Sequence, residues 1–119
     1  MRPEARDAAY LWDMLEAARE ATTILGGLEL EVLLADRVRL RAIERTLEIV
    51  GESARRVSLE FQSARREVDW RGLIGLRNVL AHDYGRINHR LLVSTATRRL
   101  PGLIAVLEAW LEPEAGDQS

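Results

Sequence analysis

Apolar side chains recur every three or four residues along most of the chain, which is the period of an amphipathic helix. The first apolar stripe spans residues 11–25 and predicts a long helix that carries these residues on one face. Gly26 and Gly27 follow it directly, and glycine tolerates the left-handed backbone of a helix C-cap, so we expect the helix to end there. The stripe consists of Leu11, Met14, Leu15, Ala18, Thr22 and Leu25.

A second stripe predicts a long helix that begins after an N-cap at Asp36 and continues to Phe61. Residues 28–36 suit a short helix or a tight connector; their alternating start would also suit a strand, but a lone strand has no partner here. The apolar positions are Ile43, Leu47, Val50, Ala54, Val57 and Phe61. Charged residues three or four apart occupy the other faces, where we interpret most of them as solvated ion pairs: Arg41, Glu44, Arg45, Glu48, Glu52 and Arg55.

Two more helices are predicted towards the C-terminus. Asp69 can cap one that runs from Trp70 towards His82, with Gly85 available to end it. Asn88 can cap the last helix, from about residue 89 to 111, whose buried stripe is Leu92, Ala96, Leu100, Leu103 and Leu107. Pro101 lies inside that stripe, so we expect a kink there and not a break.

These elements predict an all-α protein, an up-and-down bundle of four to five helices with a kinked last helix. The chain has 119 residues, the size of one domain, so residues 1–112 are expected to form a single helical domain and residues 113–119 a polar tail. There is no cysteine, which excludes disulfides and thiolate metal sites. The apolar runs are far shorter than the ~20 residues of a membrane span, and the charged N-terminus does not resemble a signal peptide, so a cytoplasmic location is expected.

Charge is distributed unevenly along the chain. The whole chain has a net charge of −2, but residues 37–99 hold 14 Arg against 7 acidic residues. A local basic surface can bind phosphates even when the whole chain is acidic. The alternative is that these arginines pair with glutamates on the helix surfaces.

The stretch RNVLAHDYG, residues 77–85, does not fit a packing pattern alone. On a helix that turns about 100° per residue, Asn78 and His82 share a face, as do Arg77 and Tyr84. Arg77 and His82 are about 140° apart, so one straight helix does not direct both at a small ligand. They can line opposite walls of a groove, and the second wall is most simply supplied by a second copy of the chain.

Known site motifs narrow the chemistry. The sequence contains no phosphate-binding glycine loop, no dinucleotide-binding glycine motif, no nucleophile elbow and no clustered metal ligands. The stretch retains a histidine that can transfer protons near neutral pH and an arginine that can hold a phosphoryl oxygen. These groups suit metal-independent RNA cleavage, in which the RNA 2′-hydroxyl is the nucleophile. The structural alternatives are a histidine that caps a helix end and an arginine held in an ion pair.

The same stretch resembles the HEPN domains (higher eukaryotes and prokaryotes nucleotide-binding), and within them the HepT-like toxins. It contains the R-x4-H-x-Y motif of that family, with an asparagine directly after the arginine. Three further segments are similar to the family's pattern: WRGLIGLRN at 70–78, LEIVGESARRVS at 47–58 and RRLPGLIAVLE at 98–108. The resemblance covers nearly the whole chain and implies a bundle of the HEPN type.

For function, the resemblance implies a homodimeric ribonuclease toxin whose two motifs face each other across a cleft. It also implies a cognate minimal nucleotidyltransferase as antitoxin. From the residues themselves we expect no cofactor and no metal. Arg77 would stabilise the transition state, and His82 would be the general acid or base. Asn78 would orient His82 or a phosphate, and Tyr84 would accept AMP from the antitoxin.

Glu52 would orient Arg77 from the preceding long helix, although an ion pair with Arg55 or Arg56 is an equal alternative. His89 matches no motif position and is expected on the surface near a helix start. Two other functions stay open: a non-catalytic subunit that binds the substrate or partner of a nucleotidyltransferase, and a structural dimer whose motif only packs.

Overall fold

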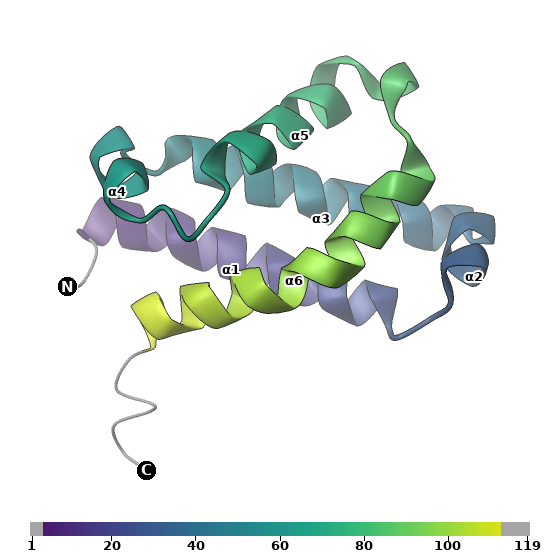
Figure 1. The fold of residues 1–119 in the computed structure, drawn as a ribbon, viewed down its shortest axis with the longest axis horizontal. Coiled ribbons are helices and arrows are strands. Elements are labelled where there is room, and N and C mark those ends of the chain that lie inside the picture. Colours follow the sequence, from purple (N-terminus) through teal and green to yellow (C-terminus); the bar gives the residue numbers. More distant parts are fainter. Residues whose placement is uncertain (1–3, 113–119) are drawn as a thin grey trace, which may run out of the picture.

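The computed structural model describes residues 4–112, and within this range the chain contains helices and turns but no strand (Figure 1). The elements are α1 (Ala5–Leu25), α2 (Leu30–Ala35), α3 (Arg37–Arg56), α4 (Leu59–Ala64), α5 (Trp70–His82), the 3₁₀ turn η1 (Tyr84–Arg86) and α6 (His89–Leu111). The all-α bundle is confirmed, with six α-helices in the described part where four to five were predicted. The predicted tail, residues 113–119, lies outside the described residues.

The predicted helix ends are formed by local capping. Gly26 has a φ of 57°, and its N–H donates to the Thr22 carbonyl oxygen at 3.1 Å. The side chains of Asp36, Asp69 and Asn88 each accept a hydrogen bond from the backbone N–H three residues further on, each at 3.0 Å. These contacts satisfy N–H groups that have no partner within the helix, so the starts of α3, α5 and α6 follow directly from the sequence.

The prediction of one helix as far as Phe61 is wrong. Helix α3 ends at Arg56, the chain turns at Val57, and the Ser58 hydroxyl caps α4 by accepting from the Phe61 N–H at 3.1 Å. Ser58 is also held from α1: its backbone N–H and its hydroxyl donate to the two carboxylate oxygens of buried Asp7, at 2.8 and 2.7 Å. Val57 and Phe61 still pack on the core after the turn, which is why the apolar spacing continues across it.

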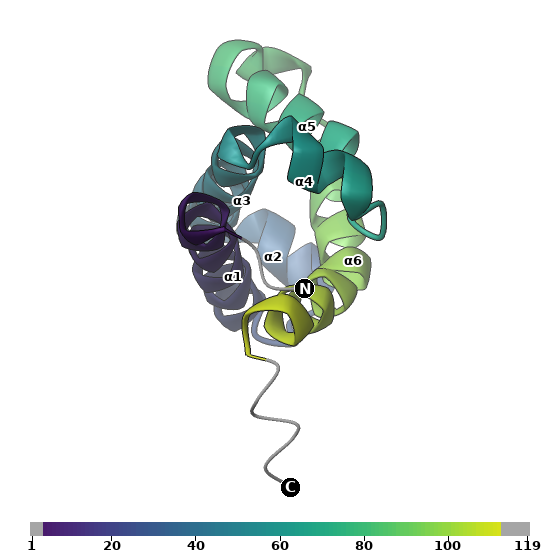
Figure 2. The same cartoon turned by 90° about the vertical axis from the view of Figure 1, so that its left-hand side faces the viewer.

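Helices α1, α3 and α6 enclose the main core, and α5 packs on α3 (Figures 1 and 2). The short helices α4 and α2 lie at opposite ends of the bundle (Figure 1). Thr22, predicted in the buried stripe of α1, is exposed, and Ala21 is buried instead. Helix α6 continues through Pro101 to Leu111. None of the helices within residues 4–112 is long and apolar enough to cross a membrane.

Gly51 lets α5 approach α3 closely. A Cβ atom at this position would lie 2.5 Å from the Leu73 carbonyl oxygen and would also overlap the Cβ of Arg77. Such distances are far inside van der Waals contact, so only glycine fits at this crossing. The Cβ atom of Arg77 therefore lies directly against the backbone of α3 at Gly51. This close crossing sets the position of the motif helix, α5.

Candidate functional site

Arg77 points towards α3 and meets Glu52. Its Nε lies 2.8 Å from Glu52 Oε2, and about a fifth of the side chain is exposed. This Nε is buried and makes no hydrogen bond of good geometry among the described residues, so the contact is an ion pair and not a well-aligned hydrogen bond. Glu52 thus contacts Arg77 from α3, and its role in orienting Arg77 stays a prediction.

Glu52 also pairs with the two arginines named as its alternative partners. Its Oε1 lies 2.8 Å from Arg55 Nη2 and 3.1 Å from Arg56 Nε. The hydrogen bond from Arg55 is the main cause that lowers the pKa of Glu52 to about 2, against the opposing effect of burial, and the charge of Arg77 adds to the lowering. Both predicted pairings therefore exist together, and Glu52 is a charged carboxylate at neutral pH.

Asn78 and His82 lie on the exposed side of α5. The Asn78 side-chain oxygen accepts a hydrogen bond from Arg77 Nη1 at 3.0 Å, so Asn78 contacts the arginine and not His82. His82 is the last residue of α5 and is exposed, and its side chain makes no hydrogen bond or ion pair within residues 4–112. Since α5 is helical from Arg77 through His82, the predicted angle of about 140° between the two side chains applies.

Tyr84 does not lie where a continued helix would place it. Helix α5 stops at His82 before Gly85 is reached, and Tyr84 starts the turn η1. Its hydroxyl donates to Glu44 Oε1 at 2.6 Å, and the guanidinium of Arg41 lies 5.5 Å from the centre of its ring. The expectation that Tyr84 shares the face of Arg77 is therefore wrong, because the chain leaves the helix one residue earlier and turns the ring towards the first half of α3.

Two residues of this region were not predicted as part of any site. Glu44, interpreted as a solvated surface residue, is only 4% exposed. Its Oε2 lies 2.5 Å from Nδ1 of His89, which is half-buried and not simply a surface residue. The spacing of Glu44 from Leu40 and Leu47, four and three residues, could have indicated its burial, because all three share the face of α3 that turns inward.

A groove of about 920 Å³ separates α5 from α6. It is lined by apolar side chains of both helices and by three arginines: Leu73, Leu76, Val79, Leu92, Ala96 and Leu103, with Arg86, Arg98 and Arg99. Of the residues of α5, only Trp70 and Leu80 are fully buried. The motif helix thus has apolar surface that the described part of the chain does not cover.

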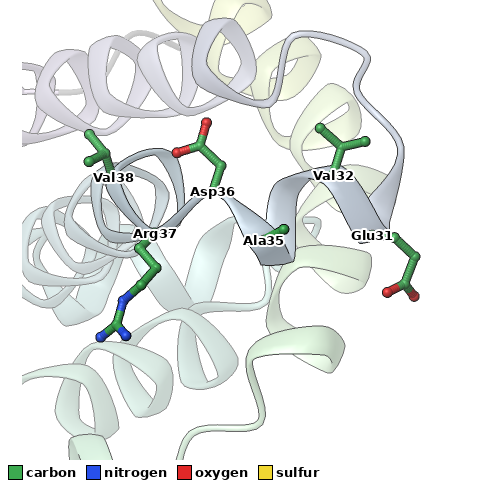
Figure 3. Close-up of a pocket in the computed structure, with 6 residues that line it drawn as sticks. All are labelled: Glu31, Val32, Ala35, Asp36, Arg37 and Val38. Atoms are coloured by element: carbon green, nitrogen blue, oxygen red, sulfur yellow. The ribbon is translucent and has the colours of Figure 1, made fainter.

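A second, shallow hollow lies at the corner between α2 and α3, shown in Figure 3. It is lined by Glu31, Val32, Ala35, Asp36, Arg37 and Val38, and contains none of the motif residues. Arg37 points to the opposite side of the chain from Asp36 and Val38 (Figure 3). Across residues 4–112, no three His, Asp or Glu side chains come together in a way that could hold a metal ion.

Comparisons with known proteins identify the family of this chain. A family model described as Ribonuclease HepT-like matches residues 14–110. The chain is 30% identical over 105 residues to a protein of Caldanaerobacter subterraneus subsp. tengcongensis named "Putative RNase", covering 88% of this chain and 94% of the relative. It is also 30% identical over 94 residues to a "Probable ribonuclease HepT" of Thermococcus cleftensis, covering 79% and 86%. A "Putative RNase" of Methanocaldococcus jannaschii is 25% identical over 115 residues, covering 97% and 95%. No solved structure matches the chain.

With four fifths of its length matched by the family model, this chain belongs to the HepT-like ribonuclease family.

Proposed function

We propose that this chain is the toxin of a toxin–antitoxin pair, a metal-independent endoribonuclease that works as a homodimer. The observation that carries the proposal is that α5 bears both an arginine and a histidine suited to this chemistry. Arg77 is held in place by Glu52, and the exposed side chain of His82 has no partner within residues 4–112. Membership of the HepT-like ribonuclease family and the RNase names of the relatives support the same activity.

Arg77 is the group that would hold the reacting phosphate. Its Nε faces Glu52, and Nη1 donates one of its two hydrogens to Asn78. The second hydrogen of Nη1 and both hydrogens of Nη2 are left to bind phosphate oxygens. A guanidinium fixed on one side loses little freedom when it binds on the other, and so it can stabilise the charge that develops on phosphorus. Glu52 and Asn78 act as positioning residues in this scheme.

His82 would transfer the protons. As a base it removes the proton of the RNA 2′-hydroxyl, whose oxygen attacks the adjacent phosphorus while the bond to the 5′-oxygen breaks. The 5′-oxygen takes a proton from an imidazolium, and the products are a 2′,3′-cyclic phosphate and a free 5′-hydroxyl. His82 of a second copy is the natural acid, because Arg77 and His82 of one copy diverge by about 140°.

The groove between α5 and α6 supports the dimer. A second copy seated there would cover apolar side chains such as Leu73, Leu76 and Val79, and would bring two motif helices together. A specific dimer should bury at least ~1,000 Å² in total. Light scattering is the direct measurement, and a monomer at micromolar concentration would remove the composite site.

Substitution of the two motif residues tests the chemistry. His82→Ala and Arg77→Ala should each slow cleavage of a short RNA by ~100-fold or more, if both act in the transition state. Arg71→Ala is the matched control, because Arg71 is an exposed arginine of the same helix and no motif residue, and it should cleave like the wild type. An oligonucleotide with one 2′-deoxyribose at the cleavage position should resist.

Two results would refute this mechanism: cleavage that EDTA abolishes, or cleavage that survives both substitutions. A pure wild-type protein that binds RNA or a nucleotidyltransferase and cleaves nothing would instead favour a non-catalytic binding subunit. Intact folding of each variant is checked by circular dichroism, since misfolding alone would abolish activity.

We further propose that the antitoxin is a minimal nucleotidyltransferase that transfers AMP to Tyr84. Tyr84 directly follows the end of α5, more than a third of its surface is exposed, and the added nucleotide would lie beside His82 and hinder RNA from reaching it. Tyr84→Phe should fold, cleave RNA and escape neutralisation, and the AMP adduct seen by intact mass on the wild type should be absent. Equal neutralisation of the Phe variant, with no adduct on the wild type, would assign Tyr84 a structural role.

A further inference from the structure

Three elements meet at a buried carboxylate. Glu44 of α3 is 4% exposed, and each of its two oxygens has a different partner. Tyr84 of η1 donates its hydroxyl to Oε1 at 2.6 Å, and Nδ1 of His89, at the start of α6, lies 2.5 Å from Oε2. The two rings also contact each other, with centres 5.6 Å apart. A carboxylate bound on both oxygens is held in one orientation, aimed at the phenol.

The cations next to Tyr84 have no acidic partner among the residues that the structure describes. Arg41 lies against the ring, and Arg37, one turn earlier on α3, is near enough for its charge to act on the hydroxyl. Both are exposed, and within residues 4–112 neither is in an ion pair, whereas Arg86 is paired with Asp83 at 3.3 Å. Two guanidinium groups whose charges act on one hydroxyl, and which have no acidic partner in the described part of the chain, favour an incoming group that carries phosphate.

The charges around Tyr84 oppose each other. The hydrogen bond to Glu44 is the main cause that raises the pKa of Tyr84, burial adds to it, and Arg41 and Arg37 act the other way. The free phenolate is thus disfavoured near neutral pH. A reaction at this oxygen must therefore move the proton while the new bond forms, and Glu44 already accepts that hydrogen bond.

We propose that Glu44 is the general base for group transfer to Tyr84, with the toxin itself supplying the proton acceptor. The inference rests on the proposed role of Tyr84 as the acceptor of AMP. The phenol oxygen forms a bond to the α-phosphorus of a nucleoside triphosphate, and the proton passes to Glu44 Oε1. The bond between the α-phosphorus and the bridging oxygen breaks, and pyrophosphate leaves. His89 holds the other carboxylate oxygen throughout.

The test uses a small alkyl fluorophosphonate on the purified protein, with no transferase present. The phenol oxygen bonds to phosphorus, fluoride leaves, and the labelled residue is identified by peptide mass. Tyr10, the only other tyrosine of the chain, serves as internal control. Tyr84 should be labelled at least about 10-fold faster than Tyr10. The substitution Glu44→Gln should lower the labelling rate of Tyr84 by ~10-fold or more.

The pH dependence separates catalysis from simple packing. If Glu44 takes the proton as the new bond forms, the reaction does not need the free phenolate, so the wild-type labelling rate should be nearly constant between pH 7 and 9. Without the Glu44 carboxylate the reaction needs the phenolate, and the ordinary pKa of a tyrosine phenol is about 10. The labelling rate of Tyr84 in the Glu44→Gln variant should therefore rise almost tenfold per pH unit over this range. The other charged or titratable groups at this position are His89, Arg41 and Arg37.

A wild-type rate that itself rises about tenfold per pH unit would overturn the proposal, and so would equal rates and slopes in the wild type and Glu44→Gln. The first measurement needs no variant and so does not depend on how Glu44→Gln folds. Failure of the AMP transfer is a separate result: if a cognate transferase leaves Tyr84 unmodified while fluorophosphonate labelling depends on Glu44, the acceptor role is wrong and the base is correct.

Discussion

Replacement of Gly51 by alanine tests whether the close crossing of α3 and α5 positions Arg77. The new Cβ would lie 2.5 Å from the Leu73 carbonyl oxygen, while ordinary contacts begin at 3.4 Å. Helix α5 must therefore shift outward by roughly 1 Å, since the atoms in the way belong to or adjoin its backbone. Forcing an extra methyl group into such a contact costs ~1–3 kcal/mol, and the better helix propensity of alanine returns about 1 kcal/mol.

We therefore expect Gly51→Ala to lower the free energy of unfolding by up to about 2 kcal/mol, measured by urea denaturation. RNA cleavage at a temperature where the variant stays folded should fall further, up to ~100-fold, because a displacement of about 1 Å at Arg77 spoils the geometry of the site. The matched control is Gly75→Ala on α5, where a Cβ would meet nothing within 4 Å. This change should stabilise the protein by about 0.5–1 kcal/mol and leave cleavage unchanged. If Gly51→Ala is as stable and as active as Gly75→Ala, the close crossing does not position Arg77.

Two further predictions concern buried and paired carboxylates. Because the folded-state pKa of Glu52, about 2, is below its ordinary 4.5, its contribution to stability is present above pH 4.5 and is lost as the pH falls towards 2. After solvent screening this amounts to at most about 1–2 kcal/mol, and Glu52→Gln should flatten that part of the stability–pH curve measured by denaturation; an unchanged curve would refute the pairing. Asp7→Ala removes both acceptors of Ser58 and should cost about 2–3 kcal/mol in urea denaturation, whereas Asp13→Ala, an exposed aspartate of the same helix, should cost little. Equal losses in the two variants would show that the two hydrogen bonds from Ser58 to Asp7 do not contribute to stability.

The starts of α3, α5 and α6 and the end of α1 were predictable from the sequence, because each depends on contacts within one turn. Asp36, Asp69 and Asn88 accept from backbone groups three residues away, and Gly26 adopts a left-handed conformation that its own lack of a side chain permits. The order of the motif residues and the 140° separation of Arg77 and His82 also follow from the chain alone, because a regular helix converts spacing into angle.

The remaining features were decided by partners distant in the sequence. The break at Ser58 depends on Asp7, 51 residues earlier, and periodicity cannot detect it because the apolar spacing continues through the turn. Glu44 is buried because Tyr84 and His89, 40 and 45 residues later, satisfy its two oxygens; without them a charge at that position would be expected in solvent. The sequence by itself determined the end of α1, the starts of α3, α5 and α6, and the residues on the motif helix. The packing of α5 and η1 on α3 decided that Arg77 meets Glu52 and that Tyr84 meets Glu44, since those contacts join groups that no local pattern relates.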